Sequence, residues 1–454
     1  MSYRLVRAFA RLLLHVFYRR VDVAGIERVP LSGPLVLASN HHEALVDPML
    51  ILTAVPRRLR PIAKAPLFRH PVIAPFLRMA GAIPVHRRQD AGSDPAKNEA
   101  MFSAAIATLG LKGAILIFPE GVSHSEPTLM PLRTGAARML LGAEALAGGR
   151  LGVTLLPVGL IFHEPGSFRT GWALVLVGDP VPTGDCVALY GTDPETAVRR
   201  LTDRLTEALR KLIVEADDRE TLHLFEIAEA IWREESLDAA HDVAARAAWI
   251  QRATRAHRYL KAREPARISG LVRRVERYAK ELERTGLRGR ELAQRYSARV
   301  IASYSLREGF SLLLGLPLAL WGITNHLIPY QLTALAIRLI RPASNAEATY
   351  KLGAAIVLFP LCWAGEGWTA WQLGGGGLLA LFLAFLIPTG FFALTWRERL
   401  RRFAHEARSF LQFLMDRDLR HHLRARRRAL MDELTELANR VPESTLAGQR
   451  EERP

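Results

Sequence analysis

The sequence predicts an α/β domain followed by a charged helical region and a membrane-associated helical hairpin. Through residue 190, short apolar runs of strand length alternate with helical patterns, and Gly and Pro stand at the junctions. After residue 305, the apolar residues gather in long uncharged runs. A chain of 454 residues has room for two or three domains of these kinds.

Composition narrows the function classes. The chain has 61 Lys and Arg against 45 Asp and Glu, and its formal net charge of +16 suits an anionic partner: nucleic acid, anionic lipid or a phosphorylated substrate. We find no zinc-ligand spacing, basic-zipper pattern or aromatic stacking motif in the sequence, so no nucleic-acid partner is expected. With two cysteines, Cys186 and Cys362, the sequence excludes a disulfide scaffold and a Cys-rich zinc site, and it fits a reducing compartment.

Residues 1–20 are expected to form a basic amphipathic helix. Arg4, Arg7 and Arg11 recur at a helical spacing that places them on one face. Arg11 also interrupts the apolar run, and no small-residue cleavage site follows, which argues against a signal peptide. We assign the segment as a helix in the membrane interface. A helix packed on the next domain is the alternative.

Residues 21–190 form the expected α/β domain, and residues 191–305 an expected helical charged domain. The expected strands are Pro34–Ser39, Ala114–Phe118, Val153–Phe162 and Trp172–Val177, and one expected helix is Asn98–Leu109. In the charged domain, basic residues are interleaved with acidic ones at helical spacing. This pattern favours solvated helical faces over a nucleic-acid site.

Residues 306–396 are the expected membrane-associated region. Three stretches lack Lys, Arg, Asp and Glu: 29 residues at 309–337, 14 at 352–365 and 30 at 367–396. About 20 apolar residues cross a bilayer. We therefore expect a transmembrane hairpin near 352–396, turning at about Gly374–Gly377. A very apolar soluble helical core is the alternative.

Prolines and polar residues set the stretch 309–330 apart, because Pro317 and Pro329 interrupt it. We expect this stretch to be re-entrant or interfacial.

The segment 397–454 is an expected basic helical tail, and it carries 11 Arg by residue 428. Basic flanks stay on the cytoplasmic side. We therefore expect a membrane protein, of the bacterial inner membrane by its Arg- and Ala-rich composition, with the α/β domain in the cytoplasm.

The most informative window for chemistry is Ser39–Leu50, SNHHEALVDPML. His42 and Asp47 are separated by four residues and should lie in a loop that leads into a helix. A carboxylate there can accept one imidazole N–H, and the other ring nitrogen then serves as a base for a substrate hydroxyl. From this spacing alone, a surface or capping histidine remains open.

Two later windows carry candidate binding residues. In GAIPVHRR, Gly81 permits a tight turn into a strand and Arg87 stands at its end, where its guanidinium suits phosphate. In FPEGVSHS, an abrupt turn follows a strand and offers Glu120, Ser123 and His124, the usual position of a site in an α/β sheet. Arg133 follows in PLRTGAARM.

Taken together in this order, the windows resemble the glycerophospholipid acyltransferase family, over about residues 20–185. The matching positions are His42 and Asp47 in its first block, Gly81, Ile83 and Arg87 in its second, Phe118, Pro119, Glu120 and Gly121 in its third, and the region of Pro157 in its fourth. The sequence departs where His41 replaces the usual Asn, and where Val122 and Ser123 replace Thr and Arg.

The resemblance implies an acyltransferase-type domain with a mixed sheet flanked by helices. It implies direct transfer of a fatty acyl group from acyl-CoA or acyl carrier protein to glycerol-3-phosphate, dihydroxyacetone phosphate or lysophosphatidic acid. His42 and Asp47 would be catalytic. The acceptor would contact Arg87, Glu120, Gly121, Ser123 and Arg133. No metal and no cofactor would be needed, because the acyl thioester is a co-substrate. Membrane lipid would be a further partner. The alternative to an active enzyme is a catalytically inactive membrane scaffold, and the two departures from the family's blocks are the features that support it.

Overall fold

The computed structural model describes residues 2–71, 73–86, 95–126, 128–163, 168–169, 171–214, 227–228, 243–285, 298–415 and 417–442. The chain divides into two compact units. The first comprises Met1–His223, Asp242–Arg255 and Ala343–Thr349, and the second comprises Leu224–His241, Ala256–Pro342 and Tyr350–Pro454. A short segment between two long C-terminal helices therefore belongs to the N-terminal unit.

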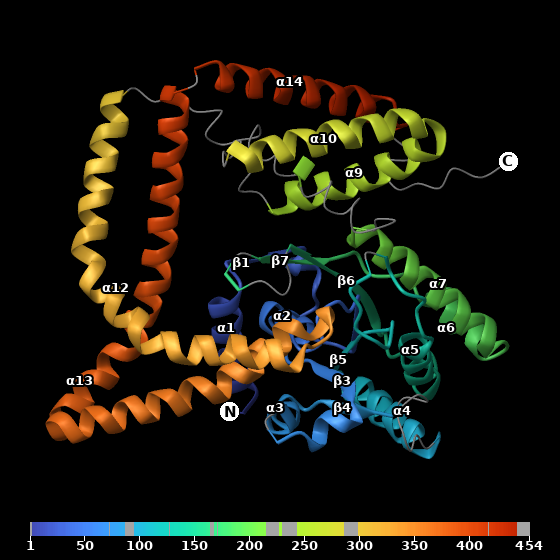
Figure 1. Cartoon of the computed structure of the whole chain (residues 1–454). Helices are drawn as coiled ribbons and strands as arrows, with labels where there is room; N and C mark the ends of the chain where they lie inside the picture. Colours follow the sequence, from blue (N-terminus) through green and yellow to red (C-terminus); the bar gives the residue numbers. More distant parts are fainter. Residues whose placement is uncertain are drawn as a thin grey trace. The chain divides into compact units, whose positions relative to one another are not determined.

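A seven-stranded mixed sheet forms the centre of the first unit (Figure 1). Its strands are β1 (Arg20–Ala24), β2 (Leu35–Ser39), β3 (Arg60–Lys64), β4 (Ile83–Val85), β5 (Ala114–Ile117), β6 (Thr154–His163) and β7 (Trp172–Val177). They are ordered β1-β7-β6-β2-β5-β3-β4, and β6 and β7 pair antiparallel while the other neighbours are parallel. The predicted mixed sheet and all four predicted strands are confirmed.

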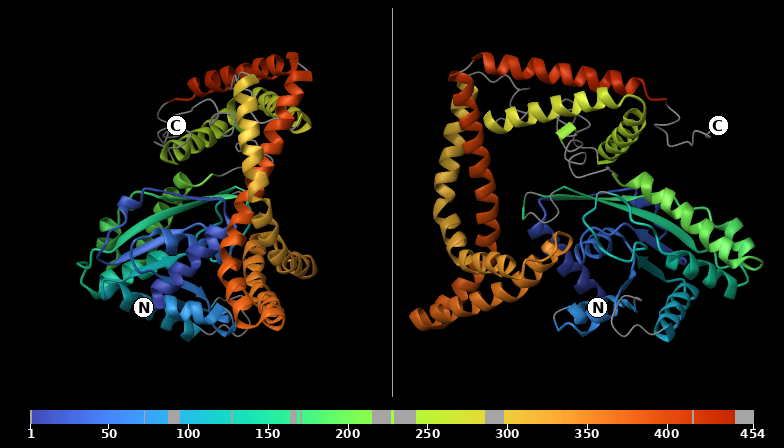
Figure 2. Two further views of the ribbon diagram at one scale, coloured as in Figure 1. Left: turned by 90° about the vertical axis from the view of Figure 1, so that its left-hand side faces the viewer. Right: turned by 45° about the vertical axis from the view of Figure 1, so that its right-hand side comes forward.

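Helices cover both faces of this sheet (Figures 1 and 2). The described helices of this unit are α1 (Ser2–Phe17), α2 (Val46–Ala54), α3 (Ile73–Ala80), α4 (Pro95–Gly110), α5 (Gly135–Leu146), α6 (Gly184–Tyr190) and α7 (Pro194–Leu212), with the 3-10 turns η1 (Ile26–Arg28), η2 (Ala65–Arg69) and η4 (Ser344–Ala346). One core contains α4 to α7 against alternate residues of β2, β5 and β6. The expected helix Asn98–Leu109 is confirmed as α4.

The N-terminal helix α1 packs on the sheet domain, which the alternative reading predicted. Its side chains Ala10, Leu14 and Phe17 are buried, and Phe9 stacks on Phe76 of α3 at 5.1 Å. One face of this helix therefore packs on α2 and α3. Leu5 and Leu12 remain 59% and 49% exposed, so the interfacial assignment of residues 1–20 stays a prediction.

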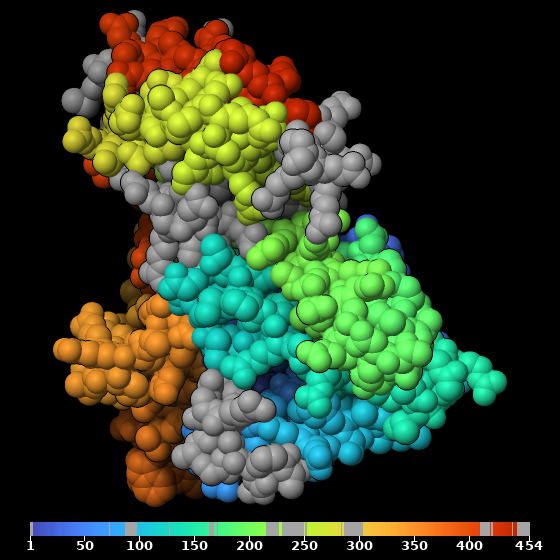
Figure 3. Space-filling model, turned by 90° about the vertical axis from the view of Figure 1, so that its right-hand side faces the viewer, coloured from blue at the N-terminus to red at the C-terminus, as the bar shows by residue number. Residues whose placement is uncertain are grey.

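Helix α7 belongs to the α/β domain and not to the charged helical domain predicted for 191–305. Leu201, Leu205 and Leu209 are no more than 2% exposed and lie in the sheet core. Their spacing of four residues forms an apolar stripe on an otherwise charged helix, whose outer side is visible in Figure 3. The domain boundary therefore falls after this helix.

The described part of the second unit is helical. The described helices of the C-terminal half of the chain are α9 (Val243–Arg263), which the unit boundary divides, α10 (Pro265–Thr285), α12 (Ala298–Ile340), α13 (Glu347–Met415) and α14 (Arg417–Asn439). Helices α10 and α14 share a core that contains Tyr278 and Leu423. The basic segment predicted as a tail thus packs on the charged helical region, because α14 has buried leucines on one side.

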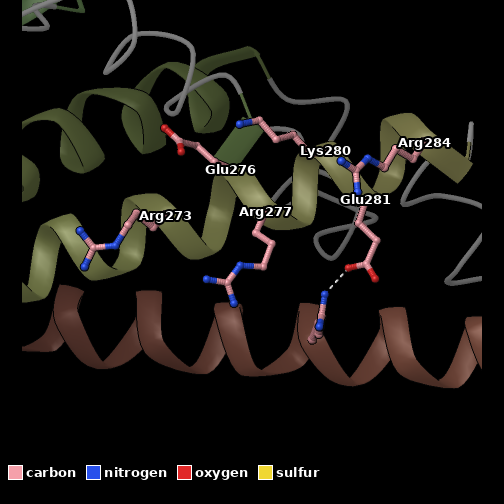
Figure 4. A pocket seen from close by; sticks show the side chains of 7 residues that line it. Arg273, Glu276, Arg277, Lys280, Glu281 and Arg284 are labelled. Atoms are coloured by element: carbon pink, nitrogen blue, oxygen red, sulfur yellow. Dashed lines mark hydrogen bonds and ion pairs between the residues drawn. The ribbon is translucent and has the colours of Figure 1, made fainter.

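A charged groove lies along α10 and α14 (Figure 4). It is lined by Arg273, Glu276, Arg277, Lys280, Glu281, Arg284 and Arg426. Five of these side chains are basic and two are acidic, so the groove is positive overall. Arg426 pairs with Glu281 across it.

The long apolar helices α12 and α13 differ in detail from the prediction. By length and composition, Ser303–Ile340 and Ser344–Arg408 are each suited to cross a membrane. The expected turn is confirmed, since Gly374 and Gly375 are non-helical and divide α13. The stretch 309–330 was expected to be re-entrant or interfacial. It lies within continuous α12, whose Pro317 and Pro329 do not end the helix, and its place relative to a membrane stays a prediction.

The part of α13 after this turn runs beside α12 (Figure 2). Trp396 donates its ring N–H to the Leu312 carbonyl at 3.0 Å, and Arg399 pairs with Glu308 at 2.8 Å. Glycine permits the approach, because a Cβ at Gly322 would collide with the Thr389 carbonyl. The second part of α13 therefore pairs with α12. Near the turn it also lies against the first part of α13, because a Cβ at Gly367 would come within 3.3 Å of Leu379.

Candidate active site

The predicted motif windows meet at one edge of the sheet. Strands β2 and β5 are parallel neighbours, with Leu35 opposite Ala114 and Ala38 opposite Ile117. Their carboxyl ends therefore lie side by side, and the loops that follow them come into contact. One loop carries the HHEALVD sequence and the other carries FPEGVSHS.

Asn40 anchors the loop after β2. Its side-chain amide donates to the Leu160 carbonyl at 2.9 Å and accepts from the Leu160 N–H at 2.7 Å. With these two hydrogen bonds, the Asn40 side chain pairs with β6 as the backbone of a neighbouring strand would. Because the side chain is only 1% exposed, its polar atoms need these protein partners. This contact fixes the backbone from which the two histidines project.

Asp47 binds His41, not His42. The His41 Nδ1 lies 2.8 Å from the Asp47 Oδ2, which also accepts the Glu43 N–H at 2.9 Å. Asp47 is in the first turn of α2 and not in the loop that the sequence predicted before this helix, and its side chain is fully buried. The predicted His42–Asp47 hydrogen bond was wrong, because the register of the loop turns the neighbouring ring toward the carboxylate.

His41 is held on several sides, and its contact with Asp47 gives this ring the carboxylate-bound geometry that the sequence predicted for His42. It is 8% exposed, and its ring stacks on Phe118 at 4.2 Å with an interplanar angle of 21°. Its backbone N–H donates to the Glu120 Oε1 at 2.7 Å. The ring and backbone of His41 therefore join the two motif loops.

His42 has the arrangement expected of a base. Its Nδ1 donates to the His124 carbonyl at 3.1 Å, which selects the tautomer whose Nε2 carries the lone pair. Burial lowers the pKa of His42 below its ordinary value of 6.5, and the negative charge of Asp47 opposes this shift without cancelling it. A neutral imidazole with an accepting Nε2 results. The group that orients it is a carbonyl, where the sequence predicted a carboxylate.

Asp47 still contributes charge to this imidazole. Its Oδ1 is buried and accepts no hydrogen bond from the parts of the chain that the structure describes. Its charge acts on His42 and would stabilise the imidazolium that forms when the base takes a proton.

Glu120 holds the two loops together. Besides the His41 N–H, its carboxylate accepts the Met130 N–H at 2.8 Å and contacts the His124 Nε2 at 2.5 Å. Its side chain is fully buried. Burial alone lowers the pKa of His124, but the hydrogen bond and charge of Glu120 outweigh burial and raise it. The prediction that Glu120 contacts the acceptor is therefore corrected: its oxygens face protein donors.

Gly121 and Arg133 form the turn beyond Glu120. Gly121 has φ +75°, and a Cβ there would come within 2.6 Å of the Arg133 Nε. The backbone N–H of Arg133 donates to the Pro119 carbonyl at 2.7 Å, while its side chain is exposed. Arg133 therefore lies beside the third motif window, and its predicted contact with the acceptor phosphate stays a prediction. Arg87 lies outside the described residues.

Ser123 is half-buried and accepts a hydrogen bond from the Asn345 amide at 3.0 Å. Its predicted role toward the acceptor stays a prediction.

Comparison with known proteins finds relatives of the N-terminal domain. The Acyltransferase family model matches residues 20–161. Over 202 residues the chain is 29% identical to "Glycerol-3-phosphate O-acyltransferase 2" of Saccharomyces cerevisiae, covering 43% of this chain and 26% of that protein. Over 207 residues it is 27% identical to human "1-acyl-sn-glycerol-3-phosphate acyltransferase alpha", covering 44% and 66%.

The N-terminal domain belongs to the glycerophospholipid acyltransferase family. The chain spans about a quarter of the yeast relative and just under two thirds of the human one. A crystal structure of the 1-acyl-sn-glycerophosphate acyltransferase from Thermotoga maritima overlaps with a TM-score of 0.35 at 18% identity, covering 46% of this chain and 79% of that one.

Within this acyltransferase domain, sequence reasoning missed the roles of Asn40, His41 and the His124 carbonyl. Asn40 and His41 are polar residues directly after an apolar strand, and this is a signal of buried hydrogen bonding at a strand end. Backbone acceptors such as the His124 carbonyl have no sequence signal. Asn345 was also missed, because it lies 222 residues from Ser123.

Proposed function

We propose that this chain is a membrane-associated O-acyltransferase that moves a fatty acyl group from an acyl-CoA or acyl carrier protein thioester to a glycerol-3-phosphate-type acceptor. The observation that carries the proposal is the orientation of His42, whose Nδ1–H is bound by the His124 carbonyl in an acyltransferase domain. That bond leaves Nε2 as the accepting nitrogen. Relatives named for glycerol-3-phosphate and 1-acyl-sn-glycerol-3-phosphate support the acceptor class.

The proposed reaction proceeds in one transfer. His42 Nε2 takes the proton of the acceptor hydroxyl while that oxygen attacks the thioester carbonyl carbon. The new C–O bond forms, the C–S bond breaks, and the leaving thiolate takes the proton from the imidazolium. The buried charge of Asp47 stabilises the imidazolium between these steps. General base catalysis of this kind contributes about 10²- to 10⁴-fold. The proposal uses no metal and no cofactor.

Arg133 is the proposed contact for the acceptor phosphate. Its exposed guanidinium lies over Gly121 at the turn that also carries Glu120. Arg offers paired donors that match phosphate oxygens. Arg87 is proposed as the second clamp from its position in the sequence.

The apolar helices support the membrane part of the proposal. Leu314, Leu361 and Trp368 are 74%, 67% and 66% exposed on α12 and α13. Large apolar side chains exposed along helices of this length fit contact with lipid. The positive groove on α10 and α14 fits an anionic leaflet. The catalytic domain is proposed to lie on the cytoplasmic side, because the flanking segments are Arg-rich. A bacterial inner membrane is proposed from the Arg- and Ala-rich composition alone.

The test is an acyl-transfer assay on membranes that contain the full-length chain. Radiolabelled acyl-CoA and acyl carrier protein are each offered with glycerol-3-phosphate, dihydroxyacetone phosphate and lysophosphatidic acid. We expect labelled product with at least one acceptor, and its loss in His42→Ala. Membrane-bound protein that gives no product with any pair would contradict the proposal and support an inactive scaffold.

A further inference from the structure

The segment Ala343–Thr349 separates the two apolar helices in the sequence, yet it belongs to the compact unit of the acyltransferase domain. It contains the 3-10 turn η4 and the first residues of α13. Its polar side chains are Ser344, Asn345 and Thr349, together with Glu347. The first three contact the two motif loops of the candidate site.

One set of contacts reaches the loop after β2. The Ala44 N–H donates to the Asn345 carbonyl at 3.1 Å, and the Leu45 N–H donates to the Thr349 hydroxyl at 3.0 Å. These N–H groups precede helix α2, whose N-cap residue Leu45 has no polar side chain to cap the helix. The segment therefore supplies acceptors that the start of α2 lacks.

A second set of contacts reaches the loop after β5. The Asn345 side-chain amide donates to the Ser123 carbonyl at 2.6 Å and to its hydroxyl at 3.0 Å. The Ser344 and Ser125 hydroxyls lie 2.6 Å apart. Ser123 and Ser125 flank His124, whose carbonyl holds the Nδ1–H of His42.

Asn345 thus binds both loops at once, through its backbone carbonyl on one side and its side chain on the other. The His42 ring projects from the first loop and its acceptor, the His124 carbonyl, from the second. A residue that ties these loops determines whether the acceptor stays opposite the ring nitrogen. Without that acceptor, the imidazole can place its proton on Nε2 and lose its basic lone pair there.

We propose that the 343–349 segment is a part of the active-site framework, and that Asn345 is a positioning residue that keeps His42 in its base-competent tautomer. The inference deepens the proposed function and rests on it. It also extends the catalytic machinery well beyond residues 20–161, into the connection between the apolar helices.

The experiment compares full-length variants in detergent micelles. Asn345→Ala removes the amide, and Thr349→Val removes the hydroxyl at nearly constant volume while Thr349→Ser retains it. Asn439→Ala, at an exposed position of α14, is the matched control. We measure kcat and the KM for the acyl donor, the melting temperature, and hydrogen exchange of peptides covering 41–46 and 118–126.

We expect Asn345→Ala to lower kcat about 10-fold or more, as for loss of one buried hydrogen bond at the site, with the donor KM within about 2-fold of wild type. Exchange should rise in both peptides. Thr349→Val should raise exchange in the first peptide, and Thr349→Ser should restore it. A purely structural role would lower the melting temperature and the active fraction but leave kcat per folded molecule unchanged.

Unchanged kcat and exchange in Asn345→Ala would overturn the inference. If that variant does not fold, the Thr349→Val and Thr349→Ser pair decides, and equal exchange in the two contradicts the framework role. Absence of turnover by the wild type would count against the proposed function alone, since hydrogen exchange still reports whether the segment holds the loops.

Discussion

His41 and Asp47 form a buried hydrogen-bonded pair in this site, with 2.8 Å between the ring Nδ1 and the carboxylate Oδ2. The neighbouring His42 instead binds a backbone carbonyl. Two adjacent imidazoles therefore have different surroundings. One is stacked, buried and bound to a carboxylate, and the other carries a lowered pKa and an accepting nitrogen.

Substitution of the two histidines should separate these roles. We expect His42→Ala to lower kcat by about 10²- to 10⁴-fold with little change in melting temperature, because it removes the proposed base. His41→Ala should destabilise the fold by about 1–3 kcal/mol, because the buried Asp47 loses its partner. Paired activity and urea-unfolding measurements check both. A larger loss of kcat per folded molecule in His41→Ala would reverse the assignment of the base.

The pH dependence of kcat/KM provides a second check. A base must be neutral to accept a proton, so activity falls as pH drops through its pKa in the folded enzyme. Burial lowers the pKa of His42, which places the acid limb below pH 6.5. The pKa of His124 is raised, so titration of that residue would place the limb above pH 6.5. The profile of wild type between pH 5 and 8, with a stability control at each pH, distinguishes them.

Glu120→Gln tests the role of the buried carboxylate. Three protein donors point at Glu120, and an amide replaces one acceptor oxygen with a group that donates. We expect a loss of about 1–3 kcal/mol in the free energy of unfolding. The acceptor KM should change little in the molecules that remain folded. A raised acceptor KM at unchanged stability would restore the sequence-based prediction that Glu120 contacts substrate.

The sequence predicted the meeting of the motif windows but not the pairing within them. Strand runs such as Leu35–Ser39 and Ala114–Ile117 are apolar and short, so the pattern predicted the strands, whereas their parallel pairing was seen only in the structure. Which of two consecutive imidazoles faces Asp47 depends on a few backbone dihedrals in the loop. No composition or spacing rule reports these, and both residues are histidine.

The sequence did not predict strands β1 and β3, whose residues are partly polar, or the contact between Asn345 and Ser123, which lie far apart in the chain. Strands β1 and β3, with the sequences RVDVA and RPIAK, have few apolar residues and lack the run that marks β2. The contact between Asn345 and Ser123 joins residues 222 positions apart, on either side of a long helical region. Long-range polar contacts of this kind come from the tertiary fold, whereas periodicity reports local structure.

Gly121→Ala tests the tight turn of the third motif window. A Cβ at φ +75° is strained by about 1–2 kcal/mol, and it would also contact the Arg133 Nε. We expect lower stability, partly recovered in the double variant Gly121→Ala with Arg133→Ala, because the second change removes the crowded side chain. Thermal unfolding of the four proteins in this cycle measures the coupling. Additive effects would show that the two side chains do not interact.

Arg133→Ala isolates the proposed phosphate contact. The guanidinium is exposed at the turn after β5, so its loss should leave the fold nearly as stable as wild type. A charge-assisted hydrogen bond contributes about 1.5–3 kcal/mol, so the KM for a phosphorylated acceptor should rise about 10- to 100-fold. The acyl-donor KM should stay within about 2-fold.

Arg133→Lys is the matched control for this prediction, because it keeps the charge but loses the planar pair of donors. Its acceptor KM should lie between those of wild type and Arg133→Ala. An unphosphorylated acceptor, such as a monoacylglycerol, should react equally slowly with all three proteins. If Arg133→Ala raises the KM of donor and acceptor alike, the side chain shapes the site as a whole, and the phosphate must be held by other residues.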